Sequence, residues 1–165
     1  MNQSIVKANT TYTAAIADIC AAGWKQTVEG KLSQEYQTKN VDFWYNHEKV
    51  YHDIKAGLYS HVALFNSEAV GVIGGAMTGP NVGEIFVLYV DETYRYKGIG
   101  KRLLEVFTKQ QIDSGATEQW VSVQDENQRG IPFYEARGFL YQKEKNSITD
   151  TGEKQVSLRY SRQLD

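Results

Sequence analysis

A short basic turn that carries two glycines is the part of this sequence best suited to chemistry. Arg95, Lys97 and Lys101 supply positive charge around Gly98 and Gly100, between an apolar stretch and a helical pattern. The first turn of a helix leaves backbone amides unpaired and carries the positive end of the helix dipole. Because glycines let a phosphate group approach the backbone closely, the turn predicts a binding site for an anion.

Two familiar nucleotide-binding patterns do not fit this turn. A P-loop would need glycine at Arg95 and, at Arg102, a hydroxyl side chain to hold magnesium. The dinucleotide fingerprint would need a third glycine at Leu103. The turn therefore binds an anion of another kind or, since short glycine motifs are weak evidence, is a strand–helix connection that binds nothing.

The sequence gives little support for covalent or metal chemistry. The single cysteine, Cys20, lies in an apolar helical pattern and is expected to be a small buried residue rather than a nucleophile. His47, His52 and His61 are not paired with cysteine or carboxylates at metal-binding spacing, so we expect no metal site.

Two motifs, in order along the chain, resemble those of the GNAT superfamily of acyl-CoA-dependent N-acetyltransferases. Residues 95–100 match the family signature Arg/Gln-x-x-Gly-x-Gly/Ala at every fixed position. Residues 127–139 resemble the downstream segment Asn-x-x-Ala-x-x-Phe-Tyr-x-x-x-Gly-Phe, with Gly130 where alanine is usual. The resemblance covers about residues 70–145, and two ordered motifs are more specific than either alone.

The resemblance implies a site for acetyl-CoA as co-substrate. Strands over residues 84–90 and 119–123 would run side by side and then splay apart, and the pantetheine arm would enter the wedge and pair with the strand edge. The pyrophosphate would bind the backbone amides of residues 97–101. The implied cofactor-binding residues are Leu88, Tyr89, Val90, Arg95, Tyr96, Lys97, Gly98, Ile99, Gly100, Lys101, Asn127, Phe133 and Tyr134.

The resemblance also implies that an amine attacks the thioester directly in a ternary complex, without an acyl-enzyme. Tyr134 is the expected general acid for the leaving thiolate; packing, with its hydroxyl bonded to cofactor or backbone, is the alternative. Glu84 begins an apolar strand where several relatives place a glutamate, and is the expected general base acting through water. Its alternative is an exposed strand-end glutamate without a catalytic role. A backbone amide near Tyr89 or Val90 would polarise the carbonyl.

The acceptor amine cannot be identified from the sequence. The resemblance places Trp24, Trp44 and Tyr45 in the wall of the acceptor pocket, although packing of these aromatics into the core is an alternative. Polyamines, amino acids, aminoglycosides and protein N-termini all remain open. A non-catalytic acyl-CoA sensor is the rival hypothesis, because it shares the cofactor features and does not need Tyr134 or Glu84.

The pattern around these residues predicts a mixed α/β fold, in a single domain over residues 1–165. The resemblance makes it a GNAT-like fold, with a central, mostly antiparallel sheet splayed between the fourth and fifth strands and helices on both faces. Residues 84–90 lack polar alternation, so burial on both faces of the sheet is expected. Predicted strands cover residues 4–7, 61–65, 70–77, 84–90, 119–123, 140–145 and 155–161; predicted helices follow an N-cap at Thr11 and cover 34–55, 98–114 and 132–137.

Composition excludes several other classes. The 165 residues include 18 Lys plus Arg and 20 Asp plus Glu, a net charge of −2, so no nucleic-acid partner is expected. An apolar run long enough to span a membrane and a basic-then-apolar leader are both absent, so we expect a cytoplasmic protein without a membrane partner. The expected partner is a small-molecule or peptide amine, and a homodimer is left open.

Overall fold

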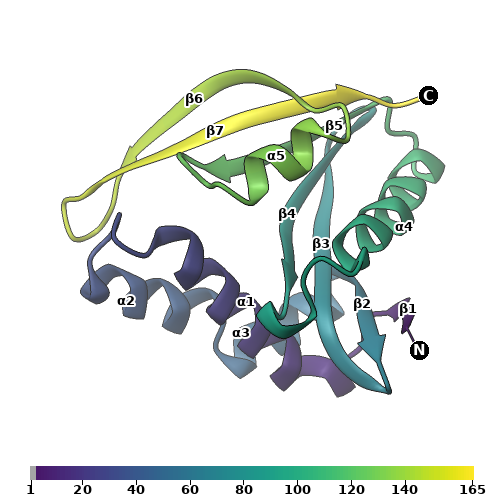
Figure 1. Ribbon diagram of the computed structural model, residues 1–165, viewed down its shortest axis with the longest axis horizontal. Coiled ribbons are helices and arrows are strands. Elements are labelled where there is room, and N and C mark those ends of the chain that lie inside the picture. Colours follow the sequence, from purple (N-terminus) through teal and green to yellow (C-terminus); the bar gives the residue numbers. More distant parts are fainter. Residues whose placement is uncertain (1–2) are drawn as a thin grey trace.

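A seven-stranded sheet runs through the computed structural model, which describes residues 3–165. The strand order is β1-β2-β3-β4-β5-β7-β6; every neighbouring pair is antiparallel except β4 and β5, which are parallel. This is the predicted mixed α/β fold with a mostly antiparallel sheet (Figure 1). The strands are β1 (Gln3–Lys7), β2 (Tyr59–Phe65), β3 (Glu68–Gly79), β4 (Val82–Val90), β5 (Glu118–Gln124), β6 (Leu140–Ile148) and β7 (Lys154–Gln163).

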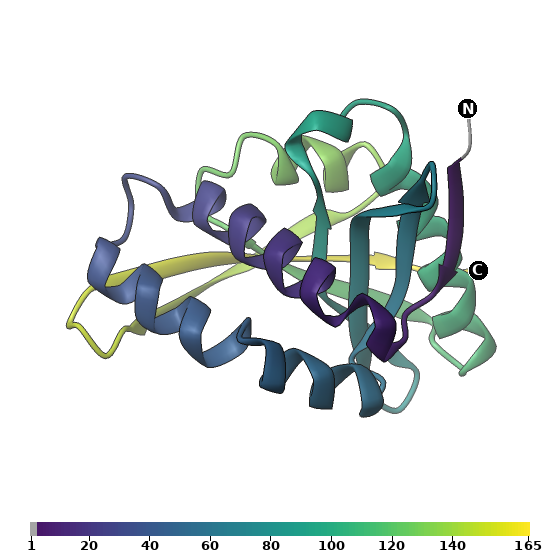
Figure 2. The same cartoon turned by 90° about the horizontal axis from the view of Figure 1, so that it is seen from below.

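Helices cover both faces of the sheet, as expected from the sequence. Figure 2 shows α1 (Thr13–Val28), α2 (Gln34–Trp44) and α3 (His47–Lys55) across one face. The opposite face carries α4 (Ile99–Asp113) and the short α5 (Gly130–Glu135), which packs against β5 (Figure 1). None of the helices between residues 3 and 165 is long and apolar enough to cross a membrane.

Each face of the sheet has its own apolar core. In β3, Val72 and Ile73 are both fully buried, and because neighbouring strand residues point to opposite faces they enter different cores. Ile73 packs with Phe107 of α4, whereas Val72 packs with Cys20 of α1. Burying a side chain of this size contributes about 1.5–3 kcal/mol. These cores hold the two helical layers in place, and Cys20 is the buried residue that was predicted.

The sheet splays apart between β4 and β5, which confirms the feature implied by the resemblance. The parallel ladder joins residues 82–85 to residues 118–121 and ends there, although both strands continue. Opposite this point, β3 pairs Gly74 with Val87 and Gly75 with Ile85, so a β-bulge falls at Phe86. A Cβ on Gly75 would lie 2.0 Å from the carbonyl oxygen of Glu84, so the bulge requires this close backbone approach.

Three sequence-based expectations about helices are wrong. The predicted helix over residues 34–55 is two helices, because Asn46 leaves the helical conformation and its Oδ1 accepts a 2.7 Å hydrogen bond from the amide of Lys49. Thr11 does not cap α1; it lies in a 3-10 turn that Asn9 caps, and α1 begins at Thr13. The last helix covers residues 130–135 rather than 132–137.

The expectation that residues 84–90 are buried on both faces is also wrong in part. β4 does lie in the middle of the sheet, but Phe86 is 49% exposed and most of its neighbours are only half-buried. The reason is the splay, which removes β5 from the side of these residues. The apolar run that resembles a fully buried strand therefore lines a cavity instead.

Candidate active site

A cavity of about 1140 Å³ lies between the diverging ends of β4 and β5. Residues 85–90 line one side and residues 121–124 the other, and α1, α2, α4 and α5 contribute further walls. The β4 edge facing the cavity has lost its strand partner, so its backbone groups are free to pair with a bound molecule. All but one of the predicted cofactor-binding residues line this cavity, the exception being Lys97.

The glycine turn at the start of α4 forms one end of the cavity. Gly98 is the N-cap of α4 with φ of 78°, a left-handed conformation that favours glycine. The first helical hydrogen bond runs from the amide of Arg102 to the carbonyl of Gly98, so the amides of residues 99–101 are available to an anion. Tyr96 also has a positive φ, 63°, and its side chain is 93% exposed.

Two guanidinium groups meet beside this turn. Arg95 and Arg129 both donate hydrogen bonds to the side-chain oxygen of Gln26 in α1, Arg129 over 3.4 Å, and the amide of Gln26 contacts Glu92. Burial and the charge of Arg129 together lower the pKa of Arg95. The two like charges repel each other, and an anion bound between them would offset that repulsion. Arg129 was not among the predicted site residues, although it lies within the second motif.

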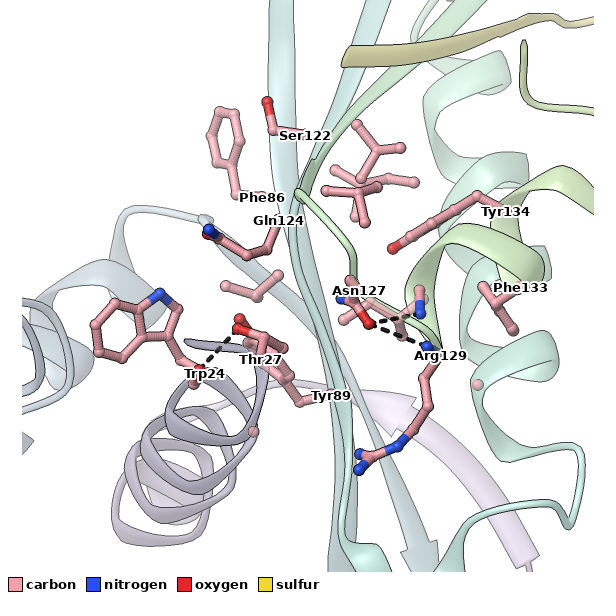
Figure 3. A pocket seen from close by; sticks show the side chains of 18 of the residues that line it. Trp24, Thr27, Phe86, Tyr89, Ser122, Gln124, Asn127, Arg129, Phe133 and Tyr134 are labelled. Carbon is pink, nitrogen blue, oxygen red and sulfur yellow. Dashed lines mark hydrogen bonds between the residues drawn. The ribbon is translucent and has the colours of Figure 1, made fainter. Parts of the chain in front are cut away.

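Asn127 shapes the start of α5. Its Oδ1 accepts hydrogen bonds from the amides of Arg129, over 3.1 Å, and Gly130, over 2.9 Å (dashed in Figure 3). These bonds form a turn just before α5, which begins at Gly130, two residues earlier than Pro132 suggested. A Cβ on Gly130 would lie 2.7 Å from the Asn127 Nδ2, so glycine here lets the amide group sit close to the helix. The predicted bond from Asn127 to the pantetheine arm stays a prediction.

Tyr134 is held by aromatic packing with its hydroxyl directed into the cavity (Figure 3). The rings of Phe133 and Phe139 each lie 5.2 Å from its ring, edge to face, and the residue is only 7% exposed. Burial raises the pKa of Tyr134, so the phenol stays protonated at neutral pH.

Glu84 does not line the same cavity as Tyr134. Since Ile85 packs into the α4-side core, the side chain of Glu84 points to the opposite face. There it forms an ion pair with Arg159, whose nitrogens lie 2.9 and 3.3 Å from the two carboxylate oxygens. Glu84 and Arg159 line a smaller hollow of about 440 Å³ with Lys143, Glu144 and Lys145. The structure therefore does not bring the two predicted catalytic side chains together.

The other side of the splay is largely aromatic. In Figure 3, Phe86, Gln124 and Trp24 lie to the left of the diverging strands, and Tyr134 lies to the right. Trp44 and Tyr45, which were predicted for this wall, also line the cavity. Three further residues that no motif marks line it as well: Phe86, Ser122 and Gln124. Their side chains are accessible because the strands separate; the family resemblance implied that separation, but not which of these side chains it would expose.

A cavity of this shape suits coenzyme A, which combines a pyrophosphate with a long arm containing amide groups. The free amides at the start of α4 suit the pyrophosphate, and the unpaired edge of β4 suits the arm that contains amide groups. The protein is accordingly placed, by fold and site, in the class of enzymes that act on CoA thioesters.

Comparison with known proteins agrees with this class. The chain matches the acetyltransferase (GNAT) family over residues 21–139. It is 28% identical over 144 residues to a spermidine N(1)-acetyltransferase of Thermoplasma acidophilum, covering 84% of this chain and 89% of that one. The crystal structure of PaiA N-acetyltransferase from Thermoplasma acidophilum with coenzyme A superposes with a TM-score of 0.82, at 25% identity over 99% of this chain and 100% of that chain.

The fold is shared more widely. The structure of YncA from Salmonella typhimurium, solved with its cofactor acetyl-CoA, has a TM-score of 0.71 at 16% identity, covering 100% of this chain and 95% of that one. The chain belongs to the GNAT family of acetyltransferases. It is an N-acetyltransferase, and its co-substrate is acetyl-CoA.

Proposed function

We propose that residues 1–165 act as one unit that transfers the acetyl group of acetyl-CoA to a primary amine by direct attack in a ternary complex. The observation that carries this proposal is the Tyr134 hydroxyl, which faces the cavity between β4 and β5. A thioester that lies along β4 would present its sulfur to the side of the cavity that carries Tyr134, and its carbonyl to the aromatic side.

In this arrangement the pyrophosphate binds the free amides of residues 99–101, and Arg95 and Arg129 contact phosphate oxygens. The pantetheine arm pairs with the β4 backbone at residues 88–90, where β5 has moved away. A backbone amide of Tyr89 or Val90 donates to the thioester carbonyl and stabilises the charge that develops on its oxygen. These contacts place the acetyl carbon where the two sides of the splay meet.

The chemical step is attack of the amine on the thioester within the ternary complex. The neutral amine nitrogen forms a bond to the acetyl carbon, the carbon–sulfur bond breaks, and Tyr134 protonates the departing thiolate. The proton lost by the nitrogen restores the phenol through solvent. Direct attack needs no protein nucleophile. Cys20 is fully buried in the other core, where burial raises its pKa, so its thiol stays protonated and unreactive.

Glu84 is proposed as the base that removes the ammonium proton through water. It forms an ion pair with Arg159 on the sheet face that carries the aromatic wall. If this role is correct, Glu84→Gln lowers kcat/KM for the amine and leaves the Kd of acetyl-CoA unchanged, measured by steady-state kinetics and calorimetry. An unchanged kcat/KM would make the Glu84–Arg159 pair structural.

The function is tested by measuring thiol release from acetyl-CoA with a panel of primary amines. Spermidine belongs in the panel because a relative is a spermidine acetyltransferase. Acetyl-CoA should also raise the melting temperature, since a ligand at 100 times its Kd stabilises the native state by about 2.7 kcal/mol. Binding of acetyl-CoA without turnover of any amine would favour the sensor hypothesis, and absence of binding would contradict both.

A further inference from the structure

The aromatic side of the splay indicates the chemical class of the acceptor amine, provided that the proposed amine transfer is correct. Phe86 and Trp44 are 49% and 45% exposed although they line the cavity, and Trp24 lies on the same side. Large aromatic faces left accessible inside a cavity favour an apolar ligand, because covering them stabilises the complex by about 25 cal/mol per Å² of area removed from water.

The charges around this wall do not favour a polycation. Of the described residues that line the cavity, Asp53 is the one carboxylate, and its Oδ1 already pairs with Lys49 Nζ at 3.2 Å. The neighbouring Glu84 is engaged by Arg159. Desolvating an ammonium group without a carboxylate partner is costly, so each additional charge of a polyamine would weaken binding here.

Cations of the protein already occupy positions that a polyamine would need. The ammonium of Lys49 lies 5.2 Å from the centre of the Trp44 ring and makes a cation–π contact with it. This face of the ring is therefore already occupied by a cation. Lys145 of β6 lines the same cavity, and Arg159 lies 5.0 Å over the Trp120 ring nearby. Asp53 and Glu84 offset the charges of Lys49 and Arg159, so among these three cations Lys145 is the one that repels a second or third ammonium, while a single amine can lose its proton before it reacts.

We propose that the preferred acceptor is a primary monoamine that carries an aromatic group, and that polyamines are poor acceptors. The ring packs against Phe86 and Trp24, and the amino group reaches the thioester at the junction of the two strands. This substrate class differs from the acceptor named for the spermidine N(1)-acetyltransferase relative. The proposal rests on the residues of the wall, which lie outside both the glycine-turn motif and the tyrosine motif.

Steady-state kinetics with three amines at saturating acetyl-CoA test the proposal. The amines are 2-phenylethylamine, ethylamine, which lacks the ring, and spermidine, which replaces it with further charge. We expect kcat/KM for 2-phenylethylamine to exceed that of each other amine by about tenfold or more, since a well-packed apolar group of this size gives at least that discrimination.

Two substitutions assign the preference to the wall. Phe86→Ser should lower kcat/KM for 2-phenylethylamine by about tenfold and change that for ethylamine little. Tyr51→Ser, which removes a 40% exposed aromatic ring outside the cavity, is the matched control and should change neither. Lys145→Glu should raise kcat/KM for spermidine about threefold at low salt, and the gain should shrink as salt increases.

The outcomes separate this proposal from the function on which it rests. Faster acetylation of spermidine than of 2-phenylethylamine, or an equal loss with all amines in Phe86→Ser, overturns the aromatic preference and leaves the transferase intact. Acetyl-CoA binding by calorimetry in Phe86→Ser verifies that the variant is folded. Failure to acetylate any amine, with acetyl-CoA bound, contradicts the transferase proposal itself.

Discussion

At the scale of single residues, the proton on Tyr134 separates an enzyme from a sensor. Tyr134→Phe keeps the ring that packs between Phe133 and Phe139 and removes only the hydroxyl. If the phenol protonates the thiolate, kcat should fall by about 10²–10⁴-fold while the affinity for acetyl-CoA changes little. Single-turnover rates and calorimetry measure the two effects separately. If the hydroxyl only binds the cofactor, affinity should weaken by about 0.5–1.5 kcal/mol with kcat nearly intact.

Arg129 gives a second prediction for a single residue. Arg129→Gln removes one of the two guanidinium groups that meet at Gln26. Because a hydrogen bond to a charged group contributes about 1.5–3 kcal/mol, the Kd for CoA should rise about tenfold or more, and kcat should hold at saturating acetyl-CoA. Lys109→Gln, which removes an exposed charge from α4, is the control for net charge. An equal rise of the Kd in both variants would show that the overall positive potential of the protein, rather than a direct contact from Arg129, binds the phosphates.

The two motifs and residues 88–90 of β4 could be predicted to line the cavity, whereas Phe86, Ser122 and Gln124 could not. Gly98 is recognisable because its position requires a left-handed backbone conformation, and Tyr134 because it lies at a fixed position of the second motif. Arg129 carries no such restriction, since its role depends on α1 supplying Gln26 across the mouth of the cavity. Phe86 has the sequence context of a buried strand residue, and only the end of the β4–β5 ladder turns it into a wall of the site.

At the scale of elements, the two glycines of the α4 turn should respond differently to substitution. Gly98 has a positive φ and open space where a Cβ would lie, so Gly98→Ala should destabilise the fold by about 1 kcal/mol through backbone strain. Gly100 has room for a small side chain, its nearest contact being the Phe133 ring at 3.5 Å. Gly100→Val should therefore leave the protein folded and block the approach of the pyrophosphate.

Chemical denaturation and calorimetry on the two variants check this difference. The prediction for Gly100 is contradicted if Gly100→Val binds acetyl-CoA with wild-type affinity. For Gly98, unchanged stability of Gly98→Ala would mean that the turn relaxes to another conformation. If Gly98→Ala loses affinity for acetyl-CoA and Gly100→Val does not, the phosphate contact would lie at the N-cap residue, Gly98, rather than at Gly100.

Most strands follow from the sequence because apolar and β-branched runs are separated by turn residues. The antiparallel pairing of β2 with β3 was predicted from such a short turn, and it is observed. The boundary between α2 and α3 was not predicted, because the aromatic spacing continues through Tyr45 and Asn46 as if one helix were present. The side chain of Asn46 sets this boundary by capping α3, and the helical spacing of the aromatic residues does not indicate where a cap will form.

At the scale of the whole molecule, the hairpin of β6 and β7 reaches across to the start of α2 (Figure 1). The backbone amide and hydroxyl of Ser33 each donate a 2.6 Å hydrogen bond to the carboxylate of Glu153, 120 positions further along the chain. Tyr36 of α2 also contacts Gln155 of β7, whose side chain lines the cavity. No sequence pattern links residues so far apart, so this contact could not have been predicted.

The Ser33–Glu153 contact should make the mobility of this hairpin depend on pH. Hydrogen bonds from the Ser33 hydroxyl, Thr151 and the Ser33 amide lower the pKa of Glu153 below its ordinary value near 4.5. A lowered folded-state pKa means that the stabilisation is fully present above pH 4.5 and is lost as the pH falls through the folded-state pKa. Amide hydrogen exchange in residues 149–154 and at the start of α2 should therefore accelerate at low pH, after correction for the intrinsic exchange rate.

Glu153→Gln should produce the same faster exchange at neutral pH, because the amide side chain cannot accept two charge-assisted hydrogen bonds. Since the hairpin and α2 both border the acceptor side of the cavity, the KM of the amine should change while the Kd of acetyl-CoA does not. Asp150→Asn, which removes a charge from the same turn, is the matched control. Equal exchange in wild type and Glu153→Gln would mean that the strand ladder of β6 and β7 alone holds the hairpin against α2, and that the carboxylate contributes nothing to closing this side of the site.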